Sequence, residues 1–208
     1  MRNTVISIAN EKLFHGRLKQ FVDFVVAFVL LIPVLHTLWK VEIVKTIGYS
    51  IFAVGSVAPD IYERIVKQIL PTSLKLSMRF SVVLHSIFGQ FLDFYEKFPF
   101  WDELLHFYGS MVITFFFFCT ISRKSKFWDV QDKGRILLSF LLGVFSGVLW
   151  EIAEFITDKL FAYTTQHSLD DTMCDLIVDC LGAYLVAKIL YKKTQGRFFW
   201  HPRKQVGK

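Results

Sequence analysis

Apolar residues along this chain gather in runs of about twenty, the length of α-helix that crosses the hydrocarbon core of a bilayer. Lys45 and two glycines interrupt the second run, and Pro59 follows it, so this run is the weakest. The pattern predicts an all-α fold, a polytopic integral membrane helix bundle of about six transmembrane helices in one domain, residues 1–208. The predicted spans are residues 20–39, 42–58, 77–95, 101–121, 136–157 and 172–190.

Composition agrees with a chain that is surrounded by lipid. Of the 208 residues, 53% are hydrophobic and 17% aromatic, and the mean hydropathy is +0.43. A soluble domain of this length needs much less apolar surface. Membrane lipids are therefore the expected surroundings. We read the net charge of +6 as a topology signal, and we expect no nucleic-acid partner.

Basic residues indicate which ends of the spans face the cytoplasm. Twenty of the 24 Lys and Arg residues fall in the N-terminal segment, the loops after the second and fourth spans, and the segment from Lys188 onward. Cytoplasmic loops of membrane proteins carry an excess of Lys and Arg. The distribution predicts that both termini are cytoplasmic, with residues 191–208 as a basic cytoplasmic tail.

Acidic residues recur at helical spacing at the outer ends of the last three spans. Residues four apart share one face of a helix, and the deeper positions of these faces carry small residues, which allow helices to pack closely. The acids should therefore point into the bundle. The three sets are Asp102 and His106; Ser139, Gly143, Gly147 and Glu151, continued by Glu154 and Asp158; and Asp171, Asp175 and Asp179.

These acids need an explanation, because a lone carboxylate near the middle of a bilayer costs about 2.5–3.5 kcal/mol. Three remedies are open: the acids bind a cation, they are partly protonated, or they line a water-filled crevice. An Asp/His pair four residues apart, as in Asp102 and His106, suits a divalent metal but is also a common salt-linked pair. His106, Glu151 and Asp175 are the candidate catalytic residues.

Three motifs, in order, carry a family resemblance. They are WDELLHFYGS at 101–110, GVLWEIAEFITD at 147–158 and LDDTMCDLIVDCLGAYL at 169–185. The chain resembles the YjdF-like bacterial inner-membrane proteins, a family of unknown function, and is more distantly similar to VanZ-like membrane proteins. The resemblance implies a multi-pass protein of the bacterial inner (cytoplasmic) membrane and a cell-envelope ligand. Its motif positions are Asp102, His106, Glu151, Glu154, Asp171 and Asp175, followed by Asp179 and Gly182.

Three functions remain open at this point. In the first, the six acidic and histidine motif positions hold a divalent cation, which orients a lipid phosphate or activates water, and His106 serves as a base. In the second, the protein is a proton- or ion-coupled transporter. The clustering of the acids at one end and the absence of proline from the last three spans count against this function. In the third, the acids lock the helices together in a structural or partner-binding protein.

Overall fold

The computed structural model of the chain describes the backbone of residues 2–124, 132–161 and 163–198. Within these ranges every regular element is a helix, which confirms the all-α class. The segment η1 is a π-helix that directly continues α4. The elements are α1 (Arg2–Trp39), α2 (Ile43–Gly55), α3 (Ala58–Val66), α4 (Thr72–Val83), η1 (Leu84–Phe91), α5 (Phe94–Lys97), α6 (Trp101–Lys124), α7 (Asp132–Phe161) and α8 (Leu169–Phe198).

Three of these helices are long and apolar enough to cross a bilayer, over Phe21–Trp39, Trp101–Ile121 and Asp132–Phe161. Helix α2 is apolar but has only 13 residues, or about 20 Å at 1.5 Å per residue. The expected span 77–95 is divided among α4, η1 and α5. The membrane-protein class is thus supported, and the full set of six crossings stays a prediction.

Helix boundaries differ from the predicted spans in two ways. Pro59 does not follow the second helix as a terminator, because it lies in the first turn of α3, where its missing N–H is not needed. Polar residues also extend several helices beyond their apolar parts, since Lys, Arg and Gln are good helix formers. Residues 191–198 of the expected tail continue α8, and residues 199–208 lie outside the described part of the chain.

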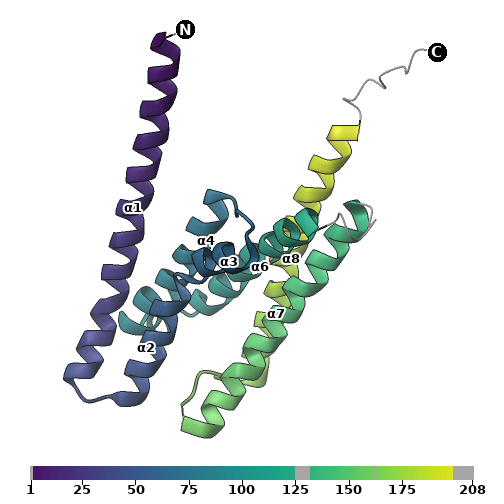
Figure 1. Ribbon diagram of the computed structural model, residues 1–208. Helices are drawn as coiled ribbons and strands as arrows, with labels where there is room; N and C mark the ends of the chain where they lie inside the picture. Colours follow the sequence, from purple (N-terminus) through teal and green to yellow (C-terminus); the bar gives the residue numbers. More distant parts are fainter. Residues whose placement is uncertain (1, 125–131, 162, 199–208) are drawn as a thin grey trace.

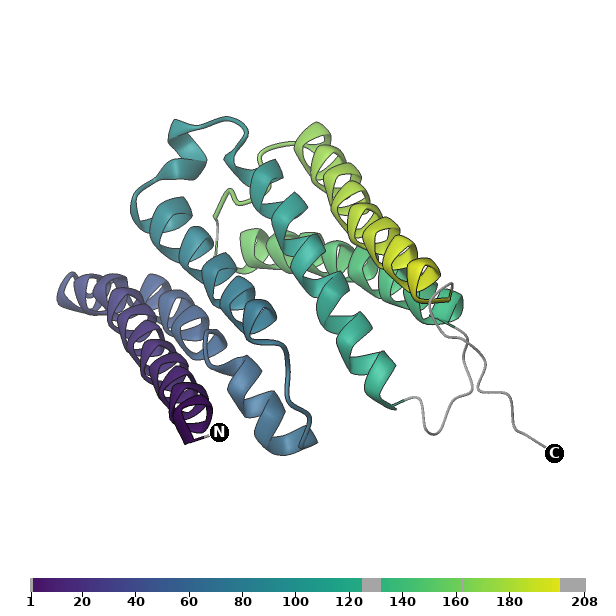
Figure 2. The same cartoon turned by 90° about the horizontal axis from the view of Figure 1, so that it is seen from above.

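Neighbouring helices in the sequence run up and down the bundle. Helices α1 and α2 form a pair on one side, α7 and α8 lie on the other, and α4 and α6 lie between them (Figures 1 and 2). The turn between α1 and α2 lies at the lower end of Figure 1, with the end of α7 and the start of α8. The start of α1 and the end of α8 lie at the upper end.

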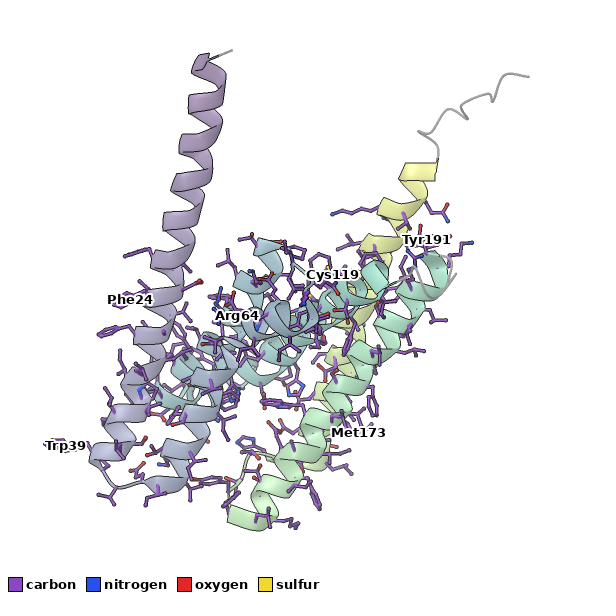
Figure 3. All side chains as sticks on the ribbon, viewed as in Figure 1. Phe24, Trp39, Arg64, Cys119, Met173 and Tyr191 are labelled. Atoms are coloured by element: carbon purple, nitrogen blue, oxygen red, sulfur yellow. The ribbon has the colours of Figure 1, made fainter. Side chains whose placement is uncertain are left out.

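Side-chain burial differs from that in a soluble protein. Many large apolar side chains point outward: Phe24 is 68% exposed and Trp39 is 87% exposed, and both project from α1 in Figure 3. Polar side chains share the interior with buried apolar ones such as Leu30 and Leu74. This distribution is the one expected when lipid covers the outer surface. The buried polar residues of α6, α7 and α8 are His106, Ser110, Thr114, Ser139, Glu151, Asp175 and Asp179.

Small residues bring α6, α7 and α8 into close contact, as the sequence predicted. A β-carbon on Gly143 would collide with the side chain of Thr114, and one on Gly147 would collide with the carboxylate of Asp179. Gly182 of α8 is equally tight against α6. Because the backbones approach this closely, the acids at the ends of the same faces are brought together.

A buried ion-pair network ties α4 to α1 and α3. Arg79 Nη1 lies 2.7 Å from Asp23 Oδ1, and Arg79 also pairs with Asp60. Lys75 Nζ lies 2.8 Å from Glu63 Oε2 and 3.5 Å from Asp60 Oδ1. Lys75 and Arg79 are two of the 20 basic residues that the sequence pattern assigns to the cytoplasmic side, and both are buried on α4. Their charges are balanced locally by acids that are distant in sequence.

Candidate functional site

Four acids from three helices surround the imidazole of His106. Asp102 comes from the first turn of α6, Glu151 from α7, and Asp175 and Asp179 from α8. Apart from Asp102, these residues are nearly inaccessible: the exposed fraction is 7% for His106, 5% for Glu151, 1% for Asp175 and 2% for Asp179. The packing faces predicted from the sequence do converge, and they place these five residues in one site.

The two nitrogens of His106 have different surroundings. Nδ1 lies 3.1 Å from Oδ2 of Asp179, while Nε2 lies 3.4 Å from Glu151 Oε1 and 3.7 Å from Asp102 Oδ1. An ionised carboxylate can only accept, so Asp179 holds the proton on Nδ1 when the ring is neutral. The lone pair of Nε2 is then directed toward the other acids. A carboxylate behind a histidine is the arrangement that orients metal-binding imidazoles.

Several atoms at the centre of the site have no hydrogen-bond partner among the described residues. They are Nε2 of His106, Oε1 of Glu151 and Oδ1 of Asp175. One ligand atom each from Asp102, His106 and Asp175 lies within 4.8 Å of the others. The ligands of a tetrahedral ion at 2.0–2.2 Å are roughly 3.5 Å apart, so the three side chains would have to move closer together, by up to about 1.3 Å between a pair of ligand atoms, to share one ion.

The segment between α7 and α8 contacts the site through Gln166. Gln166 Nε2 donates to Glu151 Oε2 at 3.1 Å and to the carbonyl of Glu151 at 3.2 Å. Asp158 fixes this segment by accepting from the backbone N–H groups of Thr165 and Gln166 at 2.8 and 3.0 Å. Asp158 therefore has a structural partner, and Gln166 holds the carboxylate of Glu151 in position.

Two motif positions have other partners. Glu154 Oε1 accepts from Trp150 Nε1 at 2.9 Å. Asp171 accepts from the backbone N–H of His167 at 3.2 Å, and its carboxylate is 3.6 Å from the His167 ring. Both acids lie at the same end of the bundle, and within the described residues neither forms a hydrogen bond or ion pair with His106, in contrast to Glu151 at 3.4 Å. Their predicted role as metal ligands stays a prediction.

A cavity of about 290 Å³ adjoins the site. Asp102, His106 and Asp179 form part of its wall, and His85 and Tyr95 form another part. His85 comes from the π-helix η1, and its Nδ1 lies 2.6 Å from the hydroxyl of Tyr95. The rest of the wall is mainly apolar, from Phe52, Val82, Leu105, Ile113 and Trp150.

Sequence reasoning missed several residues that the fold brings to this region. Gln166 lies in a polar segment with no periodicity, so no pattern marks it. His85 and Tyr95 are ten residues apart and meet only because η1 ends in a turn at Asp93, where φ is 60°. Asp179 did carry a signal, because it lies four residues after Asp175 on the same helical face.

Together, the outward apolar surface and the buried acids define a helical membrane protein with a polar centre. The sequence matches the family described as predicted membrane protein DUF2238 over residues 18–195, and the chain belongs to that family. It is 58% identical over 173 residues to an uncharacterized protein of Thermotoga maritima, covering 83% of this chain and 90% of that one. No solved structure matches the chain. The narrower likenesses to YjdF-like and VanZ-like proteins stay predictions.

Proposed function

We propose that this membrane protein binds a divalent cation through Asp102, His106, Glu151 and Asp175. The ion would serve a lipid or another cell-envelope ligand at the outer leaflet. The observation that carries the proposal is the different contacts of the two nitrogens of the His106 ring. Asp179 holds Nδ1, and the buried Nε2 is left 3.4 Å from a buried carboxylate oxygen that also has no hydrogen-bond partner among the described residues.

Charge supports the same proposal. In the part of the chain that the structure describes, the only basic group within 4.0 Å of the carboxylates of Asp102, Glu151 and Asp179 is the ring of His106, which is uncharged in this tautomer. Two carboxylates 4 Å apart repel by about 4 kcal/mol at an effective dielectric constant of 20. One imidazole cannot balance four acids, whereas a divalent cation removes most of the excess. One imidazole with several carboxylates suits Zn²⁺, Mn²⁺ or Fe²⁺ better than Mg²⁺.

The ion gives the site a chemical use. A bound divalent cation orients an oxygen ligand, polarises it, or lowers the pKa of a bound water molecule. A carboxylate ligand such as Glu151 keeps a second oxygen that would accept a proton from that water. The adjoining cavity provides space for a ligand next to the ion. We therefore place any reaction at the junction of the cavity and the metal ligands.

The proposal includes a membrane orientation. We infer six crossings in the bacterial inner membrane, with both termini in the cytoplasm and the His106 site near the outer leaflet. The alternating directions of the helices and the uneven distribution of Lys and Arg support this orientation. Reporter fusions would test it: alkaline phosphatase should be active when inserted after Tyr163 and inactive when fused after Lys208. The opposite pattern would reverse the orientation.

The metal proposal is tested by elemental analysis of the purified protein. Wild type should contain about one divalent transition-metal ion per chain, and Asp175→Asn and Glu151→Gln should contain much less. Asp132→Asn is the matched control, because Asp132 lies at the far end of α7 and pairs only with Arg135 among the described residues. Thermal unfolding of the same samples shows whether each variant is folded.

The outcomes separate this proposal from the structural role. Wild type without metal, even after incubation with Zn²⁺ or Mn²⁺, would refute cation binding. If Glu151→Gln then unfolds at a lower temperature, the acids serve to lock α6, α7 and α8 together. Metal in wild type, with metal-free but folded variants, supports a binding site.

A further inference from the structure

Polar side chains from two parts of the fold line the cavity beside His106. One group is Asp102, His106 and Asp179, and the other is His85 and Tyr95. The metal-site proposal uses only the first group. The second group comes from α5 and the π-helix η1, which contribute no metal ligand. The pair of His85 and Tyr95 is therefore a feature that needs a separate explanation.

One nitrogen of His85 is left without a partner. Its Nδ1 is engaged with the Tyr95 hydroxyl at 2.6 Å. Its Nε2 is buried and has no hydrogen-bond partner among the described residues. The ring is held in place by Phe52 at 4.3 Å and by the edge of Trp150 at 5.4 Å between ring centroids. If Tyr95 donates to Nδ1, then Nε2 is a donor; in the other tautomer it is an acceptor. A hydroxyl group can satisfy either state.

The charge of the cavity wall limits what can bind. Of the lining residues that the structure describes, none is Lys or Arg, and two are acids. Phosphates and carboxylates are normally recognised through Arg or Lys. Even with a divalent ion in place, the four carboxylates around His106 outnumber the two positive charges of the ion. An anionic headgroup would be repelled, and an ammonium group offers no acceptor for the metal or for a donor Nε2.

We propose that this cavity binds the hydroxyl end of an uncharged amphiphile. The hydroxyl lies between the metal centre and Nε2 of His85, and the apolar part packs against Phe52, Leu105 and Trp150. This inference rests on the proposed function, because it names the ligand class of the same site. A volume of about 290 Å³ holds on the order of ten non-hydrogen atoms, if each takes roughly the 30 Å³ of a liquid water molecule. Octanol is a probe of this size.

Photoaffinity labelling tests the proposal in reconstituted protein. Diazirine derivatives of octanol, octylamine and octyl phosphate share one chain and differ only in headgroup charge. Labelling of the cavity wall is mapped by peptide mass spectrometry and divided by labelling of the lipid-facing surface of α1 around Phe24. This ratio corrects for partition into the bilayer. We expect the ratio to be highest for the alcohol. An equal or higher ratio for octylamine or for octyl phosphate, or no labelling of the wall, would overturn the proposal.

Two variants sharpen the test. His85→Phe removes the hydrogen bond between Nε2 and the hydroxyl of the alcohol. It should lower the labelling ratio of the octanol probe about three- to tenfold, the usual effect of one net hydrogen bond. Gly109→Leu should lower the ratio by filling the cavity, since Gly109 lines it and a β-carbon there meets no atom within 4 Å. Gly48→Leu on α2 is the matched control, with the same free space around its β-carbon but no place in the wall. An unchanged ratio in both cavity variants would contradict the assignment.

Metal analysis of the same samples separates the two proposals. Stoichiometric metal without selective alcohol labelling refutes only the cavity assignment. Selective alcohol labelling without metal refutes only the cation site. Competition by dioctanoylglycerol, compared with free octanol, distinguishes a glyceride drawn from the bilayer from a free alcohol.

Discussion

Replacing Asp179 with Asn tests the central feature of the site, the carboxylate that holds His106. In the wild type, Asp179 Oδ2 lies 3.1 Å from Nδ1, and both side chains are buried. Asn is nearly the same size but carries no charge and can donate as well as accept. If its amide group donates to Nδ1, the proton of the ring moves to Nε2, and the nitrogen that faces Glu151 can no longer bind a metal.

The size of the effect follows from two independent considerations. Loss of a carboxylate behind a metal-binding histidine typically lowers metal affinity 10- to 100-fold, or about 1.4–2.7 kcal/mol. A hydrogen bond to a charged group contributes about 1.5–3 kcal/mol, which is the same range. We therefore expect Asp179→Asn to bind Zn²⁺ or Mn²⁺ 10- to 100-fold more weakly than wild type, although it contributes no ligand atom to the ion.

The assay is a competition titration of chelator-stripped protein against a metal-indicator dye. Asp132→Asn is again the control, and its affinity should equal that of wild type. An affinity for Zn²⁺ or Mn²⁺ within twofold of wild type would refute the argument from the His106 tautomer. Thermal unfolding gives a separate check: if the acids only repel one another in a metal-free protein, Asp179→Asn would relieve that repulsion and raise the unfolding temperature.

Three further predictions concern stability, measured by thermal unfolding in detergent. Gly143→Val should cost about 1–3 kcal/mol, because its side chain overpacks the contact with α6, while Gly48→Val should cost less. Arg79→Met should cost about 1.5–3 kcal/mol, because it removes the charged hydrogen bonds of a buried guanidinium to the partly exposed acids Asp23 and Asp60, whereas the exposed Arg64 should tolerate the same change; equal effects would contradict the ion-pair network. Burial would raise the pKa of Glu63, but hydrogen bonds from Lys75 and the Leu70 N–H outweigh it and lower the pKa from 4.5. The advantage of wild type over Glu63→Gln should therefore be complete above pH 4.5 and disappear as the pH falls through the folded-state pKa; a constant difference would contradict this assignment.

The fold could be predicted to a large extent because its signals are local. Each apolar run depends on residues that are adjacent in sequence, and the four-residue spacing of Ser139, Gly143, Gly147 and Glu151 marks one face of one helix. Backbone geometry alone then puts the acids on the packing face. Prediction was less accurate at Pro59, which begins α3, and over residues 77–95, which a π-helix divides, because neither feature leaves a mark in the hydropathy pattern.

The chain by itself determined that this is a helical membrane protein and that its acids gather at one end of the bundle. The tertiary structure decided which of them share a centre. It separated Asp175 and Asp179 from Asp171, although all three follow one helical face, because only the first two reach His106, whereas Asp171 accepts from the backbone N–H of His167. It also revealed the pairing of His85 with Tyr95 and the ion pairs of Arg79. The residues in these contacts are not spaced at helical intervals along the chain. Only the packing of the helices brings them together.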